Sequence, residues 1–329
     1  MNAWIVSPRG PLALAQLPLT PLAPTKVRVR VRYAGVGFAD VMAAAGGYPL
    51  APRPPFSPGY EFAGVVEALG TEAQSDLVVG QRVAGMLPTM GAYREVLDLD
   101  PVWAVPVPRT LDDATAALVP LNYLTAAALL DRLTNLKAGQ SFLIHGAAGG
   151  VGSAVLELAR DRSLRAYGTA HPAKWSQLEP GVTPLDSSGA WDEELRRREP
   201  RGVDAAFDSF GGRSLERSWK VLGSRGTLVS YGFSPTPGGG WGPLLAGLAS
   251  VAGKFLVSGG RAKVLGTPRI VDSHRDWYRT TLSGLFDQVA QGSLKPRLHA
   301  ILPFTEALWA HELIVRRQAT GKLLLEFPS

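Results

Sequence analysis

The chain has 329 residues, a formal net charge of +6, and 46% hydrophobic but only 19% charged residues, and it contains no cysteine. The length predicts two domains, and this composition is typical of a folded globular protein rather than a disordered one. Without cysteine, disulfides, thiolate nucleophiles and cysteine-ligated zinc or iron–sulfur centres are excluded.

The distribution of the charge does not predict a nucleic-acid partner. Basic residues are scattered, and the one dense run, residues 196–198, fits a solvated helix face. We also expect no membrane partner, because the most apolar run, residues 244–258, contains a lysine and is too short to span a bilayer. The first residues do not have the pattern of a signal peptide, so we expect a cytoplasmic location.

The first 110 residues predict a β-rich domain. Residues 27–33 alternate apolar and basic side chains, as in a strand with one buried face. Closely spaced prolines at 49–58 indicate a loop. Short strands at 60–68, 80–85 and 92–97, separated by turn residues, then predict a compact barrel-like fold.

From residue 111 onward the sequence predicts helices and then a regular alternation of strands and helices. The strands are expected at 142–145, 164–169, 203–207 and 226–231, and the helices at 112–118, 123–133, 151–161, 192–199, 212–222 and 275–291. This alternation is typical of a doubly wound parallel sheet. Residues 303–327 predict a helix and a last strand that rejoins the first domain. The Gly/Pro-rich, then apolar segment 234–263 interrupts the pattern; it could cover a cleft, form a subunit contact or be a surface excursion.

The turn Ala147-Ala-Gly149-Gly150-Val-Gly152 follows a short apolar run and precedes an amphipathic one. It has the Rossmann fingerprint with alanine in the first glycine position. Gly149 would let the backbone approach a pyrophosphate, Gly152 would let helix and strand lie close, and the helix N-terminus would offer N–H groups to the phosphates. An ordinary strand–helix turn is the alternative. The predicted dinucleotide-binding residues are Ala148, Gly149, Gly150, Val151 and Gly152.

Seven motifs lie in order along nearly the whole chain, at residues 34–40, 47–49, 58–66, 124–126, 147–152, 208–212 and 320–322. Together they resemble the zinc-free quinone-oxidoreductase (zeta-crystallin-like) branch of the medium-chain dehydrogenase/reductase superfamily. The resemblance implies a GroES-like β-rich domain formed by residues 1–115 and 297–329, and a Rossmann domain formed by residues 116–296. It also implies a homodimer joined through the Rossmann sheet.

Two positions argue against a catalytic zinc ion. The zinc-dependent members of the superfamily use a cysteine and a histidine as ligands where this chain has Gly37 and Tyr60. Neither residue is a useful zinc ligand, so we expect no metal and no metal-dependent alcohol oxidation. The neighbouring Glu61 is expected to be structural.

The cofactor is expected to be NADPH rather than NADH. NAD-selective folds carry an acid at the tip of the second strand, whereas this strand is followed by His171 and Lys174, which could meet a 2′-phosphate. The alternative is that Lys174 caps the next helix and His171 is an ordinary surface residue. The resemblance places further residues near the nicotinamide or the phosphates, although each could be structural: Asn122, Thr125, Thr169, Ser209, Tyr231, Gly232, Phe233 and Lys322.

The resemblance also supplies candidate catalytic residues. Tyr48 stands where related enoyl-thioester reductases carry a candidate proton donor, but it could equally be a Tyr-Pro turn residue beside the nicotinamide. Asp40 matches the family, and it could instead cap a helix. Gly37 departs from the asparagine that is usual in quinone reductases, which puts quinone specificity in doubt.

The sequence thus predicts a zinc-independent, NADPH-dependent oxidoreductase that transfers a hydride to a small-molecule substrate, either a quinone or an α,β-unsaturated carbonyl compound. A 2-enoyl-thioester reductase is one alternative, because Lys174-Trp175 is similar to the enoyl-reductase modules of polyketide synthases. A protein that binds NADPH with little or no turnover is the other.

Overall fold

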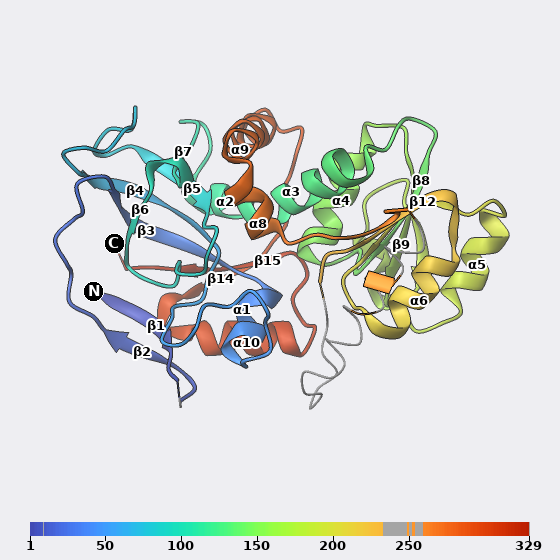
Figure 1. Ribbon diagram of the computed structural model, residues 1–329, viewed down its shortest axis with the longest axis horizontal. Coiled ribbons are helices and arrows are strands. Elements are labelled where there is room, and N and C mark those ends of the chain that lie inside the picture. Colours follow the sequence, from blue (N-terminus) through green and yellow to red (C-terminus); the bar gives the residue numbers. More distant parts are fainter. Residues whose placement is uncertain (9, 233–248, 250–251, 254–258, 329) are drawn as a thin grey trace. The chain divides into compact units, whose positions relative to one another are not determined.

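The computed structural model describes residues 1–8, 10–232, 249, 252–253 and 259–328 (Figure 1). The chain divides into two units, of which unit 1 contains Met1–Leu124 and Pro268–Ser329 and unit 2 contains Thr125–Thr267. The two ends of the chain therefore fold together in unit 1. The boundaries expected from the sequence, 115/116 and 296/297, stay a prediction.

Unit 1 is built on a seven-stranded sheet in the order β14-β15-β3-β4-β5-β7, with β6 also paired to β3. The central strand alternates as predicted from Val29 to Arg32, but Arg28 departs from the pattern because it is buried in an ion pair with Asp98. The C-terminal strand β15 runs antiparallel to β3, with Leu324 opposite Gly35, which confirms the predicted return to the first domain. The strands of unit 1 are β1 (Asn2–Val6), β2 (Leu12–Gln16), β3 (Val27–Val36), β4 (Glu61–Leu69), β5 (Arg82–Met86), β6 (Val96–Leu99), β7 (Val105–Pro106), β14 (Leu298–Pro303) and β15 (Lys322–Glu326).

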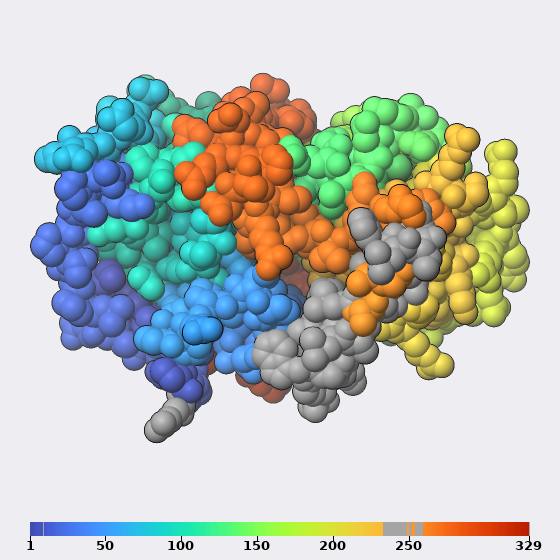
Figure 2. Space-filling model, viewed as in Figure 1, coloured from blue at the N-terminus to red at the C-terminus, as the bar shows by residue number. Residues whose placement is uncertain are grey.

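The helices of unit 1 come from distant parts of the chain. They are α1 (Phe38–Ala44), α2 (Asp113–Ala117), most of α3 (Pro120–Ala127), α8 (Thr267–Ser273), α9 (Arg275–Ala290), α10 (Ala307–Val315) and the short 3-10 turns η1 (Pro101–Trp103) and η4 (Phe304–Glu306). Helix α9 is joined to the sheet by Tyr278, whose buried hydroxyl donates to the Trp103 carbonyl at 2.8 Å and accepts from the Met86 amide at 3.0 Å. Figures 1 and 2 show α8 and α9, in orange shades, at the surface of this unit.

Unit 2 has a six-stranded, fully parallel sheet in the order β10-β9-β8-β11-β12-β13. All residues of β8 are buried, as expected for a central strand that is covered on both faces. The parallel sheet confirms the predicted Rossmann fold. Its strands are β8 (Ser141–His145), β9 (Arg165–Ala170), β10 (Thr183–Asp186), β11 (Val203–Asp208), β12 (Leu222–Ser230) and β13 (Ala262–Val264), and its helices are α4 (Gly150–Arg160), α5 (Trp191–Arg198), α6 (Gly212–Lys220), the π-helix η2 (Ala128–Thr134) and the 3-10 helix η3 (Pro172–Gln177).

Several edge elements were not expected from the sequence. Strand β10 contains Pro184, which suppresses a strand signal but is tolerated because β10 is the edge of its sheet. Strand β13 is only three residues long.

Most of the segment 234–263 lies outside the described residues, so its three interpretations stay open. None of the helices within the described ranges has the length and apolarity needed to cross a bilayer.

Candidate functional site

The carboxyl end of β8 in unit 2 forms the glycine turn. Gly146 has a φ of 66°, a backbone conformation that favours glycine, and its carbonyl accepts from the Gly149 amide at 2.8 Å. Gly149 is the N-cap of α4 and provides no side-chain cap. The first N–H groups of a helix have no partner within the helix, so the start of α4 offers donors and a partial positive charge to an anion.

The spacing around the turn depends on two glycines. A Cβ atom on Gly152 would lie 2.2 Å from the Gly146 carbonyl oxygen, and one on Gly168 of β9 would lie 2.7 Å from Cβ of Ala147. A Cβ atom on Gly149 would be less crowded, at 3.2 Å from the same oxygen of Gly146. Gly152 therefore permits the tight return of the chain, while Gly149 leaves the backbone bare at the helix start. These residues fit a pyrophosphate, as the fingerprint predicts.

A buried polar network lies directly under this turn. The ring of His145 lies 2.9 Å from Thr169 Oγ1 through Nδ1 and 2.8 Å from Ser218 Oγ through Nε2. Ser218 donates to Asp208 Oδ2 at 2.9 Å, and Asp208 also accepts from the amides of Phe210 and Gly211. The network joins the carboxyl ends of β8, β9 and β11.

The hydrogen bonds define the tautomer of His145. Because the Ser218 proton goes to Asp208, the serine oxygen accepts from Nε2–H, and Nδ1 accepts from the Thr169 hydroxyl. Burial lowers the pKa of His145, so the ring is neutral. Thr169, a predicted cofactor residue, is 1% exposed and its hydroxyl is already engaged here. Sequence reasoning missed His145 and Ser218, because a lone histidine at a strand end has no motif around it.

The two residues that were predicted to bind the 2′-phosphate, His171 and Lys174, follow the end of β9. His171 is exposed, and its Nδ1 accepts from the Ala173 amide at 3.2 Å, so it caps η3. Lys174 is half-buried in the same turn. The acidic residue at this edge is Asp186, opposite Ala170 at the end of β10. Hydrogen bonds from Ser188 lower the pKa of Asp186, so its carboxylate is charged. The sequence did not single out Asp186 because β10 was not expected.

The remaining predicted residues of unit 2 lie near the ends of β8 and β11 or at its border. The Tyr231 hydroxyl donates to the His145 carbonyl at 3.1 Å, and Gly232 lies against Ser209. Thr125 and Thr267 share a hydrogen bond of 2.8 Å between their hydroxyls. Phe233 lies outside the described residues.

In unit 1, Asp40 is a buried carboxylate surrounded by donors. Its oxygens accept from the amides of Gly37 at 2.8 Å and Gly59 at 3.1 Å, and the Tyr93 hydroxyl lies 3.5 Å away. Asp40 therefore closes the start of α1 and ties it to the loop before β4. Burial raises the pKa of Asp40 to about 6, although the two amides and the charge of Lys322 oppose this effect.

We expect Asp40→Asn to change how stability depends on pH. The pKa of Asp40 is about 6 in the folded chain against its usual 3.8, so folding favours the protonated form. That stabilisation is complete below the unfolded pKa and is lost as the pH rises through the folded one. From about pH 4.5 to about pH 7.5, the free energy of unfolding of the native chain should fall by about 2 kcal/mol relative to that of the variant. Urea titrations at both pH values measure this difference. A constant difference would show that Asp40 does not titrate as a buried acid.

Tyr48 and Tyr60 form a second cluster in unit 1. Their ring centroids are 6.2 Å apart with an edge-on angle of 79°. Tyr60 is 1% exposed, whereas Tyr48 is half-buried and so is the outer member of the pair. Burial is the main reason why the pKa values of both hydroxyls are raised.

The predicted cofactor residue Lys322 is buried against Glu61. The two form an ion pair with side chains 4% and 0% exposed. Glu61 Oε2 also accepts from the Leu121 amide at 2.8 Å, which joins β4 to the first turn of α3. A Cβ atom on Gly35 would lie 2.3 Å from Glu61, so that glycine makes room for the carboxylate. Glu61 therefore has the structural role expected from the sequence. Asn122, the residue of α3 that follows Leu121, is also buried.

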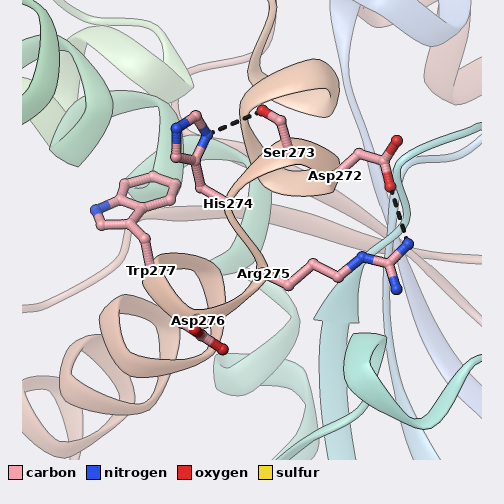
Figure 3. A pocket seen from close by; sticks show the side chains of 6 residues that line it. All are labelled: Asp272, Ser273, His274, Arg275, Asp276 and Trp277. Carbon is pink, nitrogen blue, oxygen red and sulfur yellow. Dashed lines mark hydrogen bonds and ion pairs between the residues drawn. The ribbon is translucent and has the colours of Figure 1, made fainter.

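No three histidine, cysteine, aspartate or glutamate side chains gather as potential metal ligands within the described part of the chain. A hollow of about 490 Å³ lies at the junction of α8 and α9 and is lined by residues 272–277 (Figure 3). Four of its polar side chains form two pairs: Ser273 contacts His274 at 2.9 Å, and Arg275 contacts Asp272 at 3.4 Å. The hollow is open and contains none of the predicted site residues, so it is not the candidate site.

The chain is similar to known proteins over most of its length. Residues 23–109 match the family model described as alcohol dehydrogenase GroES-like domain, and residues 184–325 match the one described as zinc-binding dehydrogenase. The rat synaptic vesicle membrane protein VAT-1 homolog is 33% identical over 324 residues, which are 95% of this chain and 80% of that protein. The chain spans 64% of the length of the Danio rerio homolog, to which it is 32% identical.

Two further relatives match over nearly their full length. A probable quinone oxidoreductase of Schizosaccharomyces pombe is 29% identical over 97% of this chain and 95% of its own. The crystal structure of the quinone oxidoreductase of Pseudomonas syringae pv. Tomato DC3000 superposes with a TM-score of 0.84 at 27% identity, over 99% of this chain and all of that one. The similarity thus includes both units.

Proposed function

Because the chain belongs to the medium-chain dehydrogenase/reductase superfamily and is quinone-oxidoreductase-like, we propose that it is a zinc-independent, NADPH-dependent reductase of quinones or α,β-unsaturated carbonyl compounds. The observation that carries the proposal is the glycine turn after β8, where the backbone is bare and the start of α4 has no side-chain cap. The absence of ligands at positions 37 and 60 supports zinc independence.

In this proposal the residues of the chain bind the cofactor, hold the loops of the site and donate a proton. When bound, NADPH supplies a hydride from its nicotinamide ring. The start of α4 holds the pyrophosphate through backbone N–H groups, and the network under it fixes the turn. Tyr48, in unit 1, donates a proton to the reduced substrate, and Asp40 holds the loop that precedes β4. The protein thus orients the reactants and excludes water rather than providing a covalent intermediate.

The preference for NADPH rests on Lys174 and His171, which we propose bind the 2′-phosphate. A charge-assisted hydrogen bond of this kind contributes about 1.5–3 kcal/mol, so Lys174→Ala should weaken NADPH binding about 10- to 100-fold and NADH binding hardly at all. Fluorescence titration with both dinucleotides measures this. Lys220→Ala is the matched control. Lys220 is the last residue of α6, just before β12 begins, so it lies at the amino edge of the sheet, whereas the dinucleotide is expected at the carboxyl edge.

If Lys174→Ala weakens both dinucleotides equally, the lysine does not read the 2′-phosphate. Tighter binding of NADH than of NADPH by the native chain would instead favour Asp186 as a partner of the ribose hydroxyl, since that carboxylate lies at the same edge.

Two other functions stay open. A 2-enoyl-thioester reductase is favoured by the Lys174-Trp175 pair, and it would show a rate that depends on an acyl thioester. A protein that binds NADPH without turnover would bind the dinucleotide yet reduce no acceptor. Steady-state reduction of quinones, enones and an enoyl-CoA separates the three. The homodimer and the cytoplasmic location implied by the resemblance are likewise proposals.

A further inference from the structure

The hydroxyl of Tyr60 is a buried donor for which the described residues provide no hydrogen bond of normal length. The whole residue is 1% exposed, so the hydroxyl is withdrawn from bulk water. An unpaired buried hydroxyl destabilises a fold, and when one persists a functional reason should be sought.

The group next to Tyr60 is Tyr48. The two rings meet edge to face at 6.2 Å, and Tyr48 is the outer, half-buried one. Burial raises the pKa of both hydroxyls, and the interaction with Tyr60 opposes this rise at Tyr48. Geometry sets the roles: the Tyr60 hydroxyl is the buried group that needs an acceptor, and the outer ring of Tyr48 lies against it.

Two charged side chains also act on Tyr48. The carboxylate of Asp40 opposes a negative charge on the Tyr48 oxygen, whereas Arg269 of α8 favours it. Arg269 is exposed, so solvent weakens its effect. The buried Tyr60 hydroxyl is a neutral group that also favours that charge and so offsets Asp40.

We propose that Tyr60 is a positioning residue for Tyr48: its hydroxyl donates to the Tyr48 oxygen and stabilises the phenolate that forms when Tyr48 gives up its proton. This inference rests on the proposed function. In that reaction the Tyr48 O–H bond breaks, its proton forms a bond to the substrate, and the electron pair stays on the tyrosine oxygen. The hydride comes from NADPH, which is oxidised to NADP⁺, and water returns a proton to Tyr48.

The first test measures Tyr48 directly and needs no turnover. Tyr48 is replaced by a trifluorotyrosine, whose more acidic phenol titrates in an accessible pH range, and its pKa is followed by ¹⁹F NMR in the full chain. Tyr60→Phe should raise this pKa by about one unit, since the phenolate loses one hydrogen bond from a neutral hydroxyl. An unchanged pKa would overturn the proposal.

Tyr278→Phe is the matched control, because it removes another buried tyrosine hydroxyl of unit 1, one that bonds Trp103 and Met86. It is expected to lower stability and to leave the pKa of residue 48 unchanged. An equal shift in both variants would show a general loosening of the unit and would also overturn the role of Tyr60.

The second test is a double-mutant cycle on turnover. Tyr60→Phe should lower kcat about 3- to 10-fold with little change in KM, and it should have no further effect in a Tyr48→Phe background. Additive effects would contradict a role exerted through Tyr48. If Tyr48→Phe itself leaves turnover intact, the proton-donor assignment in the proposed function fails, and the NMR titration still decides whether Tyr60 tunes Tyr48.

Discussion

Gly152→Ala is expected to abolish dinucleotide binding and to lower the free energy of unfolding by about 3 kcal/mol. The new Cβ atom would lie 2.2 Å from the Gly146 carbonyl oxygen and 2.8 Å from Cα of Ala147. Both are backbone atoms of the turn, so no side-chain rotation can relieve the clash, and the start of α4 must move. Urea denaturation and fluorescence titration with NADPH measure the two effects.

Two further glycine variants make this test specific. Gly284→Ala in α9 adds the same methyl group inside a helix, but nothing lies within 4 Å of it, so stability should rise by up to about 1 kcal/mol. Gly149→Ala meets only the 3.2 Å contact and should leave the fold nearly intact, while its Cβ atom hinders the approach of a pyrophosphate. A folded Gly149→Ala protein with unchanged NADPH affinity would argue that the phosphates bind elsewhere.

Breaking the buried pair of Glu61 and Lys322 is expected to have the other large effect. The side chains are 0% and 4% exposed, so removing one leaves the other as an uncompensated buried charge. Lys322→Met or Glu61→Gln should each cost about 3–5 kcal/mol of unfolding free energy. The double variant should recover much of this loss, because glutamine keeps an acceptor for the Leu121 amide and no charge remains buried. Urea denaturation of the four proteins provides the cycle.

The double variant also separates the two roles considered for Lys322. If the lysine is only structural, a folded Glu61→Gln/Lys322→Met protein should bind NADPH like the native chain. If it contacts the cofactor, as the family resemblance implies, the same protein should be stable but bind NADPH weakly. Additive losses of stability in the double variant would contradict a direct interaction between the two side chains.

The regular parts of the fold could be predicted from the sequence because their patterns are local. The alternation at residues 27–33 indicates one buried face, and β3 has it, although Arg28 on the other face is buried as well. The apolar run before the glycine turn indicates a buried strand, and β8 is buried throughout. Edge strands escaped prediction because short, proline-containing segments such as β10 carry little signal and are stabilised by the neighbouring strand.

The contacts of the site were less predictable, because they join residues far apart in the sequence. The pairing of Glu61 with Lys322 spans most of the chain, and the contact of His145 with Ser218 joins two strand–helix units. Neither pair has a spacing that a motif could reveal. The sequence indicated the residue types near the dinucleotide turn, but only the fold shows that Thr169 turns its hydroxyl toward His145.

The central claim, zinc-independent reduction with NADPH, is tested most directly by the oxidation of NADPH at 340 nm with chelator-treated protein. The acceptors are a quinone, an α,β-unsaturated ketone and an enoyl-CoA, with NADH in parallel. We predict turnover that the chelator does not reduce and that is faster with NADPH than with NADH. No turnover with any acceptor while NADPH still binds, or activity that returns only when zinc is added, would contradict it.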